Sequence, residues 1–214
     1  MRDWNTLTAD ENRILKKHYT KGRRGARVNK VIVHYNYGDL SIPGIYNVWQ
    51  KRPASAHYQV DRNGRVGQLV WDGDTAWHAG NRDANRTSIG IEHANGDRGN
   101  PKGKLTAACI DNGSHLVAAI CKRYGLGRPK WMVNVFPHNH FTSTSCPGPL
   151  ATTQREEYMR RAQYWYDQMT GSNNCTPPKP QPKPAAKEFL ITVTAKSGLN
   201  IRKGPGAKFA RNGA

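Results

Sequence analysis

A proline-rich segment near the C-terminal end of the sequence sets the strongest limit on how this chain can fold. Residues 175–187 read CTPPKPQPKPAAK. Proline fixes φ and removes a backbone donor, so such a run favours an extended spacer over a helix or an inner strand. We therefore expect the 214 residues to divide into a large domain over 1–170, a linker over 171–187 and a small unit over 188–214.

Short apolar runs alternate with helical patterns in the first 170 residues, which indicates an α/β domain. The segments 30–35 (KVIVHY) and 88–94 (SIGIEHA) have the β-branched, apolar composition of buried strands. The segments 56–60 and 66–70 flank the sequence DRNGR, whose Asn-Gly pair indicates a hairpin. We expect a mixed central β-sheet flanked by helices.

Helices are predicted from start signals and from helical spacing of apolar residues. The segments 8–11 and 153–156 both have the T-x-x-E form of a capping box, and Ser41-Ile-Pro suits a helix start. The segment 105–124 has apolar residues on a helical period and ends before Gly125. These three starts and the one periodic segment predict the helices that cover the sheet.

Two of the four cysteines, Cys109 and Cys121, fall within the predicted helix 105–124. Twelve positions in a continuous helix correspond to about 18 Å along its axis. A disulfide needs Cα atoms within about 7 Å of one another, so we expect no bridge between these two cysteines.

The net charge of +18 at pH 7 favours a polyanionic partner. Nucleic acid, anionic lipid and an anionic cell wall all satisfy this condition. The sequence has no helix with a concentrated basic face and no recognised nucleic-acid motif, so we expect no nucleic acid partner. It also has no apolar run of about 18 residues, so we expect no membrane insertion. The first residues lack an apolar signal region, which predicts synthesis in the cytoplasm without a signal peptide.

Three side chains suggest a metal site. His34 ends the first predicted strand, where a rigid element can hold a ligand. A polar loop over 137–148 (PHNHFTSTSCPG) carries His138 and Cys146. Two imidazoles and one thiolate are typical zinc ligands, and they leave a fourth position open for water, as in catalytic zinc sites. The alternatives are a His34 packed beside Tyr35, an ordinary buried thiol at Cys146 and solvated loop histidines.

Glu92 lies in a strongly apolar strand, and a carboxylate there is costly to bury unless it is paired, protonated or close to a metal. Strand alternation places Gly90 and Glu92 on one face, and His93 with the isoleucines on the other. Glu92 is therefore a candidate general base that faces a cleft. A salt bridge with one of the arginines is the alternative, and His93 is expected to be structural.

Five ordered blocks resemble zinc N-acetylmuramoyl-L-alanine amidases of the type-2 amidase group, which includes phage endolysins, bacterial autolysins and relatives of the animal peptidoglycan-recognition proteins. The resemblance covers residues 25–168. The blocks are 31–34 (VIVH), 55–64 (SAHYQVDRNG), 76–80 (AWHAG), 88–92 (SIGIE) and 138–148 (HNHFTSTSCPG).

The resemblance implies an enzyme that hydrolyses the amide between the lactyl group of muramic acid and L-alanine. It assigns a Zn²⁺ cofactor to His34, His138 and Cys146. It assigns to Glu92 the activation of the water that attacks the amide carbonyl. A recognition module that binds peptidoglycan without hydrolysis and a secreted bacterial autolysin remain as alternatives.

The resemblance also implies residues that contact the substrate. Trp77 and His78 match a segment at the substrate groove of the family, although Trp77 could equally belong to the core. Tyr58 is a weak substitute for a tyrosine that some relatives carry at the position of Ala56. Thr144 stands where many relatives have a lysine thought to stabilise the oxyanion, and a hydroxyl is a weaker, uncharged donor.

The segment 193–206 resembles the first part of a bacterial SH3-type cell-wall-binding domain. Together with the amidase resemblance, this implies bacterial peptidoglycan as the partner, in Gram-positive walls with anionic polymers. We expect a monomeric bacteriolytic endolysin that is made in the host cytoplasm and acts on the cell wall after release. Its activity should fall as salt screens the attraction between the basic protein and the wall.

Overall fold

The computed structural model describes residues 6–95, 100 and 103–172. The chain divides into two units, Met1–Lys179 and Pro180–Ala214. The SH3-type segment lies outside the described residues, as does the linker beyond residue 172, so both remain predictions. The description below concerns the first unit.

A six-stranded sheet forms the centre of this unit. In sheet order its strands are β1 (Glu11–Asn12), β5 (Val66–Gln68), β4 (Tyr58–Val60), β7 (Ser88–His93), β3 (Lys30–Val33) and β8 (Val135–Pro137). The β4–β5 hairpin is antiparallel, and the other neighbouring pairs are parallel. A separate antiparallel pair joins β2 (Tyr19–Thr20) to β6 (Thr75–Ala76). The mixed sheet predicted from the sequence is confirmed.

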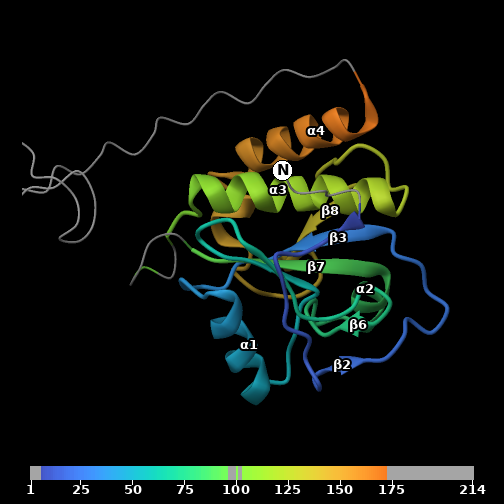
Figure 1. Cartoon of the computed structure of the whole chain (residues 1–214), viewed down its shortest axis with the longest axis vertical. Coiled ribbons are helices and arrows are strands. Elements are labelled where there is room, and N and C mark those ends of the chain that lie inside the picture. The colour runs from blue at the N-terminus through green and yellow to red at the C-terminus, as the bar shows by residue number, and fades with distance from the viewer. Residues whose placement is uncertain (1–5, 96–99, 101–102, 173–214) are drawn as a thin grey trace, which may run out of the picture. The chain divides into compact units, whose positions relative to one another are not determined.

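Helices cover both faces of the sheet, as Figure 1 shows. Helix α3 (Ala107–Arg123) packs on β3, β4 and β7, and α4 (Arg155–Thr170) packs on the outside of α3. On the other side, α1 (Ile42–Lys51) contacts β4, and α2 (Arg82–Thr87) contacts β6 and β7. Within the described residues, no helix is both long and apolar enough to cross a bilayer.

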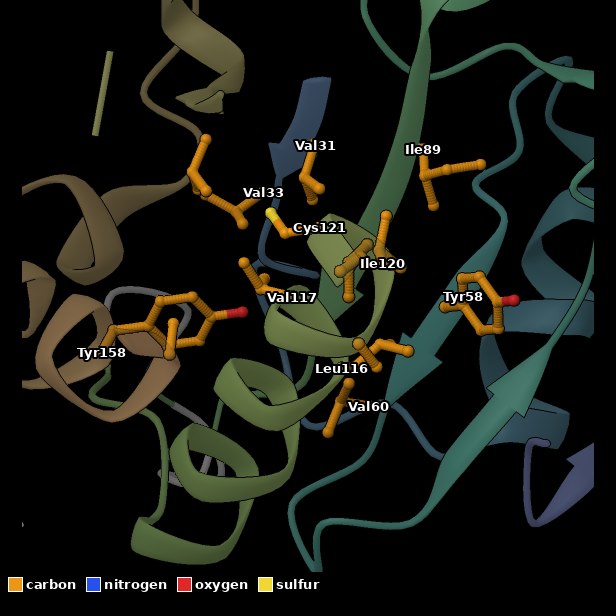
Figure 2. Close-up of a cluster of buried hydrophobic side chains, with 14 of the residues drawn as sticks. Val31, Val33, Tyr58, Val60, Ile89, Leu116, Val117, Ile120, Cys121 and Tyr158 are labelled. Atoms are coloured by element: carbon orange, nitrogen blue, oxygen red, sulfur yellow. The ribbon is translucent and has the colours of Figure 1, made fainter. Parts of the chain in front are cut away.

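The largest core cluster lies between the sheet and α3. Figure 2 shows the strand side chains of Val31, Val60 and Ile89 beside Leu116 and Ile120 of α3. All five are fully buried. Each such side chain contributes roughly 1.5–3 kcal/mol through burial. Cys109 and Cys121 are buried free thiols in α3, which agrees with the prediction that they are not bridged.

Two helices begin at capping residues, of which Ser41 was predicted from the sequence. Ser41 caps α1, because its side-chain oxygen accepts a hydrogen bond from the backbone N–H of Gly44 at 3.2 Å. Thr106 caps α3 in the same way, with the N–H of Cys109 at 3.1 Å. The helix predicted over residues 105–124 is therefore confirmed, with its end at Arg123.

The helix predicted at residues 8–11 is wrong, because this segment leads into the edge strand β1. The N–H groups of Asp10 and Arg13 donate to the carbonyl oxygens of Val66 and Gln68, both at 2.8 Å. The Asp10 carboxylate in turn accepts from the N–H of Val66 at 2.7 Å. The backbone groups that a helix would have used are satisfied by β5, and this long-range pairing overrides the local capping pattern.

The last helix forms, but without the predicted capping box. Helix α4 begins at Arg155, and its N-cap residue Gln154 makes no capping hydrogen bond with its side chain. The amide of Gln154 instead accepts from the N–H of Leu105 at 2.9 Å and donates to the Leu105 carbonyl at 3.0 Å. This side chain therefore ties the start of α4 to the segment that leads into α3.

Candidate metal centre

Parallel strand pairing brings two histidines together. In the β3–β8 register, Val33 lies opposite Pro137, so His34 and His138 follow at the same end of adjacent strands. His34 is 1% exposed, and its backbone N–H donates to the carbonyl of Ile91 at 2.8 Å. The centroids of the two imidazole rings lie 4.4 Å apart. The sheet thus holds both predicted ligands on rigid elements.

Cys146 reaches the histidines from the loop that follows His138. Its carbonyl accepts from the N–H of Asn139 at 3.0 Å, which closes the loop back on itself. Gly148 then packs against Tyr35, since a Cβ at this glycine would lie 2.8 Å from the tyrosine ring. The Sγ atom of Cys146 lies 3.7 Å from Nδ1 of His34.

The donor atoms of His34, His138 and Cys146 all lie within 4.8 Å of one another. In a tetrahedral zinc site a nitrogen and a sulfur ligand are separated by about 3.6 Å, close to the distance between His34 and Cys146. Both ring nitrogens of His138 are buried, and neither has a hydrogen-bond partner in the described part of the chain. Buried polar atoms without partners are rare, and a metal would satisfy one of them. The three residues fit a zinc ion.

Burial keeps these groups in their neutral forms. It lowers the pKa of His34 well below 6.5, and the neighbouring rings of His78 and His138 lower it further. Burial likewise lowers the pKa of His138. The pKa of the Cys146 thiol is raised by burial and by the carboxylate of Glu92. Neutral imidazoles are ready to coordinate, whereas the thiol must lose its proton when a metal binds.

Glu92 faces this centre from β7, as the strand alternation predicted. The β3–β7 register pairs Val33 with Ile91, so His34 and Glu92 follow side by side on the same face of adjacent parallel strands. The side chain is partly exposed, and its Oε2 atom accepts from Nδ2 of Asn36 at 3.0 Å. Burial raises the pKa of Glu92 to about 7, although Asn36 and the guanidinium of Arg52 lower it. Within the described residues, Glu92 does not form the arginine salt bridge considered as an alternative.

Two polar residues that hold Glu92 were missed in the sequence. Nε2 of Gln59 donates to the side-chain oxygen of Asn36 at 2.7 Å and to the carbonyl of Leu40 at 2.9 Å. This pair fixes the amide of Asn36, which binds Glu92. Gln59 is fully buried. A glutamine between Tyr58 and Val60 in an apolar strand was the available signal, because burial of an amide requires partners.

Tyr58, predicted to bind substrate, does not lie at this centre. The β4–β7 register pairs Tyr58 with Ile91 and Gln59 with Glu92, so Tyr58 points to the α3 face. It is 1% exposed, and Figure 2 shows it within the hydrophobic core. Its hydroxyl group lies 3.2 Å from Nε2 of Gln68. The prediction for Tyr58 is corrected because alternation puts its neighbour on the side of the metal centre.

His78, also predicted to contact substrate, is only 8% exposed and lies against His34. Nδ1 of His78 lies 3.0 Å from Nε2 of His34. The ring packs over Gly90, where a Cβ would lie 2.6 Å away. Burial lowers the pKa of His78 to about 3. The structure therefore supports a contact with the histidine ligand rather than with a substrate.

His93 lies on the opposite face of β7, where it was expected to be structural. Its Nδ1–H donates to the carbonyl of His34 at 2.7 Å, because a carbonyl can only accept. Its Nε2 atom accepts from the hydroxyl of Tyr158 at 2.8 Å. His93 thus connects α4 to the backbone of the first candidate ligand.

Trp77 is 39% exposed, so it does not belong to the core. Its indole N–H donates to the hydroxyl of Thr20 at 3.0 Å. It lines a cavity of about 900 Å³ that does not include the three candidate ligands. The other lining residues are Thr20, Arg24, Thr75, Asn81, Arg82, Asp83, Asn85 and Arg86. Asn85, one of the lining residues, accepts a hydrogen bond from the backbone N–H of His78. The role of Trp77 in substrate binding stays a prediction.

Thr144 lies in the loop of Cys146. Its hydroxyl oxygen accepts from the backbone N–H of Cys146 at 3.2 Å, and the side chain is partly exposed. The hydroxyl proton remains able to donate elsewhere. The predicted contribution of Thr144 to oxyanion stabilisation stays a prediction.

Curated relatives of the chain are cell-wall amidases and endolysins. The N-acetylmuramoyl-L-alanine amidase CwlL of Bacillus licheniformis is 27% identical over 158 residues, which is 65% of this chain and 41% of the relative. The endolysin of Staphylococcus phage 2638A is 26% identical over 162 residues, 65% of this chain and 33% of that protein. The chain thus matches less than half the length of each of these relatives.

A solved amidase structure and a family model also match this chain. The crystal structure of Staphylococcus aureus hydrolase AmiA in complex with its ligand superposes with a TM-score of 0.60 at 20% identity. The match covers 78% of this chain and 89% of AmiA, and it shows a shared fold. The profile described as N-acetylmuramoyl-L-alanine amidase matches residues 24–149, which is more than half of the chain and includes all three candidate ligands together with Glu92. The chain therefore belongs to the type-2 amidase family.

Proposed function

We propose that this protein is a zinc-dependent N-acetylmuramoyl-L-alanine amidase that acts on bacterial peptidoglycan as an endolysin. The observation that carries the proposal is the convergence of His34, His138 and Cys146, with Glu92 on the strand next to His34 and on the same face of the sheet. Three ligands of this kind leave one coordination position for water or substrate, which distinguishes a catalytic zinc site from a structural one. Family membership supports the same activity.

The proposed reaction is hydrolysis of the amide between the lactyl group of muramic acid and L-alanine. A water oxygen forms a bond to the lactyl carbonyl carbon, and Glu92 accepts the proton that this water loses. The carbon–nitrogen bond then breaks, and Glu92 returns the proton to the leaving nitrogen. The products are a lactyl carboxylate and a stem peptide with a free L-alanine amino group. A positioned carboxylate can carry out both proton transfers; burial raises the pKa of Glu92 in the zinc-free protein, and a bound cation would lower that pKa again.

Zinc at this centre would supply a Lewis acid that polarises the amide carbonyl and makes water a stronger nucleophile. The protein's own residues provide the rest of the arrangement. Asn36 and Gln59 hold the carboxylate of Glu92 in place. Thr144 is the candidate for an additional donor to the oxyanion. Its uncharged hydroxyl is weaker than an ammonium group, so most of that stabilisation would fall to the metal.

The direct test compares the 214-residue chain with its Cys146→Ser variant on purified Gram-positive peptidoglycan. We expect the wild type to release stem peptides with a free L-alanine amino terminus, identified by mass spectrometry. Metal analysis should find about one zinc ion per chain. The variant should lose both zinc and activity, because serine is a poor zinc ligand. Cys121→Ser is the matched control, since this thiol lies in α3, outside the candidate ligand set.

The outcomes separate the alternatives. Zinc bound without any release of peptides would favour a recognition module that binds peptidoglycan and does not hydrolyse it. Cleavage within the glycan or within the stem peptide would contradict the amidase assignment. A wild type without zinc that still releases stem peptides would exclude His34, His138 and Cys146 as a zinc site.

The proposed partner is a Gram-positive wall that carries anionic polymers. The net charge of +18 supports this proposal, because a cationic enzyme is attracted to such a wall at long range. Three arginines, Arg24, Arg82 and Arg86, line the cavity beside Trp77. We further propose that the protein acts as a monomer on the cell wall after its release from the cell in which it is made.

Substitution of Trp77 by alanine should raise the apparent KM for soluble peptidoglycan fragments roughly three- to tenfold, the range expected for loss of one aromatic contact. The value of kcat should change less, because Trp77 is not part of the metal centre. Trp77→Phe keeps an aromatic face and should retain most of the affinity. Steady-state kinetics of both variants measure the effect, and an unchanged KM in Trp77→Ala would remove this residue from the substrate site.

A further inference from the structure

A chain of hydrogen bonds runs from the end of α2 to the first candidate metal ligand. The hydroxyl of Ser88 bonds to the carbonyl oxygen of Ala84. The same hydroxyl oxygen lies 3.2 Å from Nε2 of His78. Nδ1 of His78 lies 3.0 Å from Nε2 of His34. Ser88 is fully buried, and His78 and His34 are 8% and 1% exposed, so solvent has little access to this chain.

The direction of every bond in this chain follows from its first member. The carbonyl of Ala84 can only accept, so the single hydroxyl proton of Ser88 is donated to it. Towards His78 the serine oxygen must then accept, which requires a proton on Nε2 of His78. A neutral imidazole carries one proton, so Nδ1 of His78 has a lone pair and accepts from Nε2–H of His34.

This series of hydrogen bonds leaves Nδ1 of His34 without a proton. The same atom lies 3.7 Å from Sγ of Cys146. We propose that His78 and Ser88 are positioning residues that fix the tautomer and the ring orientation of His34, so that its Nδ1 lone pair points at the metal. This inference rests on the zinc site of the proposed function. Partners of this kind are known to orient histidine ligands in metalloproteins.

The local fold holds His78 in the position that this role requires. The side-chain oxygen of Asn85 accepts from the backbone N–H groups of His78 and Ala79, at 3.0 and 2.7 Å. The ring occupies the space over Gly90, and any larger residue there would collide with it. These contacts fix both the backbone and the ring plane of His78. A histidine that served only to bind substrate would not need them.

A second contact holds His34 from the opposite side of the sheet. Nδ1–H of His93 donates to the carbonyl oxygen of His34. The backbone of His34 is therefore fixed by His93, while its ring is fixed by His78. Removal of His78 should release the ring alone and leave the strand in place.

The first test reads the tautomers directly in the zinc-free protein by nitrogen-15 NMR of the histidine rings. We expect His34 and His78 both to carry their proton on Nε2. In His78→Leu, the ring of His34 should become a mixture of tautomers. A wild-type His34 with its proton on Nδ1 would overturn the proposal, whatever the activity of the enzyme.

The second test measures zinc affinity by competition with a chelator. His78→Leu should bind zinc about 10- to 100-fold more weakly than the wild type, the usual effect of losing such a partner. His78→Asn should recover much of the affinity, because its amide oxygen can accept from Nε2–H of His34. Ser88→Ala should weaken binding in the same direction but by less. The d–d spectrum of the Co²⁺-substituted protein should change in His78→Leu and return towards the wild-type form in His78→Asn.

His115→Leu is the control, because His115 is a histidine of α3 whose ring stacks on Trp165 of α4 at a centroid distance of 4.0 Å. It should keep the zinc affinity of the wild type within a few fold, even where its melting temperature falls. Equal losses in His115→Leu and His78→Leu would show a general effect of destabilisation and would overturn the proposal. A wild type that binds zinc with the expected tautomers but leaves peptidoglycan intact would refute the amidase function alone.

Discussion

Replacement of Glu92 by glutamine is expected to lower the rate of peptidoglycan hydrolysis by about 10²- to 10⁴-fold, the range for loss of a general base. An amide can neither accept the proton of the attacking water nor return it to the leaving nitrogen. The zinc content should stay at the wild-type level, since Glu92 is not one of the three candidate ligands. Release of stem peptides and metal analysis on the same preparation measure both quantities.

The same substitution should raise the stability of the zinc-free protein in neutral and alkaline solution. Burial raises the pKa of Glu92 from 4.5 to about 7, so the folded state binds this proton more tightly than the unfolded state. Stability is therefore lost as the pH rises from about 4.5 to 7, and the loss is complete above that range. Glutamine carries no charge and avoids the loss. We expect a higher melting temperature for Glu92→Gln at pH 8 and little difference at pH 4.5.

Glu156→Gln is the matched control for this prediction. Glu156 lies exposed in the first turn of α4, and the substitution makes the same chemical change there. It should leave both the rate of hydrolysis and the melting temperature close to the wild-type values. A Glu92→Gln enzyme with wild-type activity would show that another group accepts the proton.

The zinc-free protein is expected to unfold cooperatively as the pH falls below about 6. Four histidines are buried in neutral form, namely His34, His57, His78 and His93. Burial lowers the pKa of His78 to about 3 and that of His93 to about 4, and it also lowers the pKa values of His34 and His57. In the unfolded chain all four would titrate near 6.5. Below that pH the unfolded state therefore binds more protons, and stability is lost as the pH falls towards the folded values.

The expected size of the acid effect is large. Each buried histidine that stays neutral costs about 1.4 kcal/mol of stability for every pH unit below 6.5. The stability of a typical domain is roughly 5–15 kcal/mol, so four such groups can exhaust it within a few pH units. Burial also raises the pKa values of Glu92 and Asp72, which works in the opposite direction, but among the described carboxyl groups these two alone contribute to this compensation.

Circular dichroism and tryptophan fluorescence over a pH titration measure this transition. The titration should be repeated at high salt, where repulsion among the many surface cations is screened while burial of the histidines is unaffected. A transition that persists at high salt supports the buried histidines as its cause. A native spectrum retained at pH 3 would show that they gain protons without unfolding of the domain.

The candidate metal centre could be proposed from the sequence because its residue types are unusual in their positions. His34 ends an apolar strand, and His138 and Cys146 share one short polar loop. Glu92 interrupts an apolar strand, and alternation alone gave the face on which it lies. The structure adds the β3–β8 register, which places the strand end and the loop side by side.

Features that depend on distant partners could not be predicted. The segment that contains Asp10 has the local pattern of a helix start. It forms a strand because it pairs with β5. Gln154 caps no helix because Leu105, far away in the sequence, binds its amide. The contact of His78 with Ser88 and His34 depends on ring positions that spacing does not give. The position of Tyr58 could have been predicted, because alternation in β4 places Tyr58 and Gln59 on opposite faces of the sheet.

The two outer strands of the sheet also bear on how the protein behaves in concentrated solution. An open strand edge presents free N–H and C=O groups, which can template pairing with a second chain. Strand β1 contains only two residues, and β8 contains three and ends in Pro137, which has no N–H to donate. Neither edge is long enough to seed a continuous intermolecular sheet. The described domain is thereby protected from edge-to-edge aggregation.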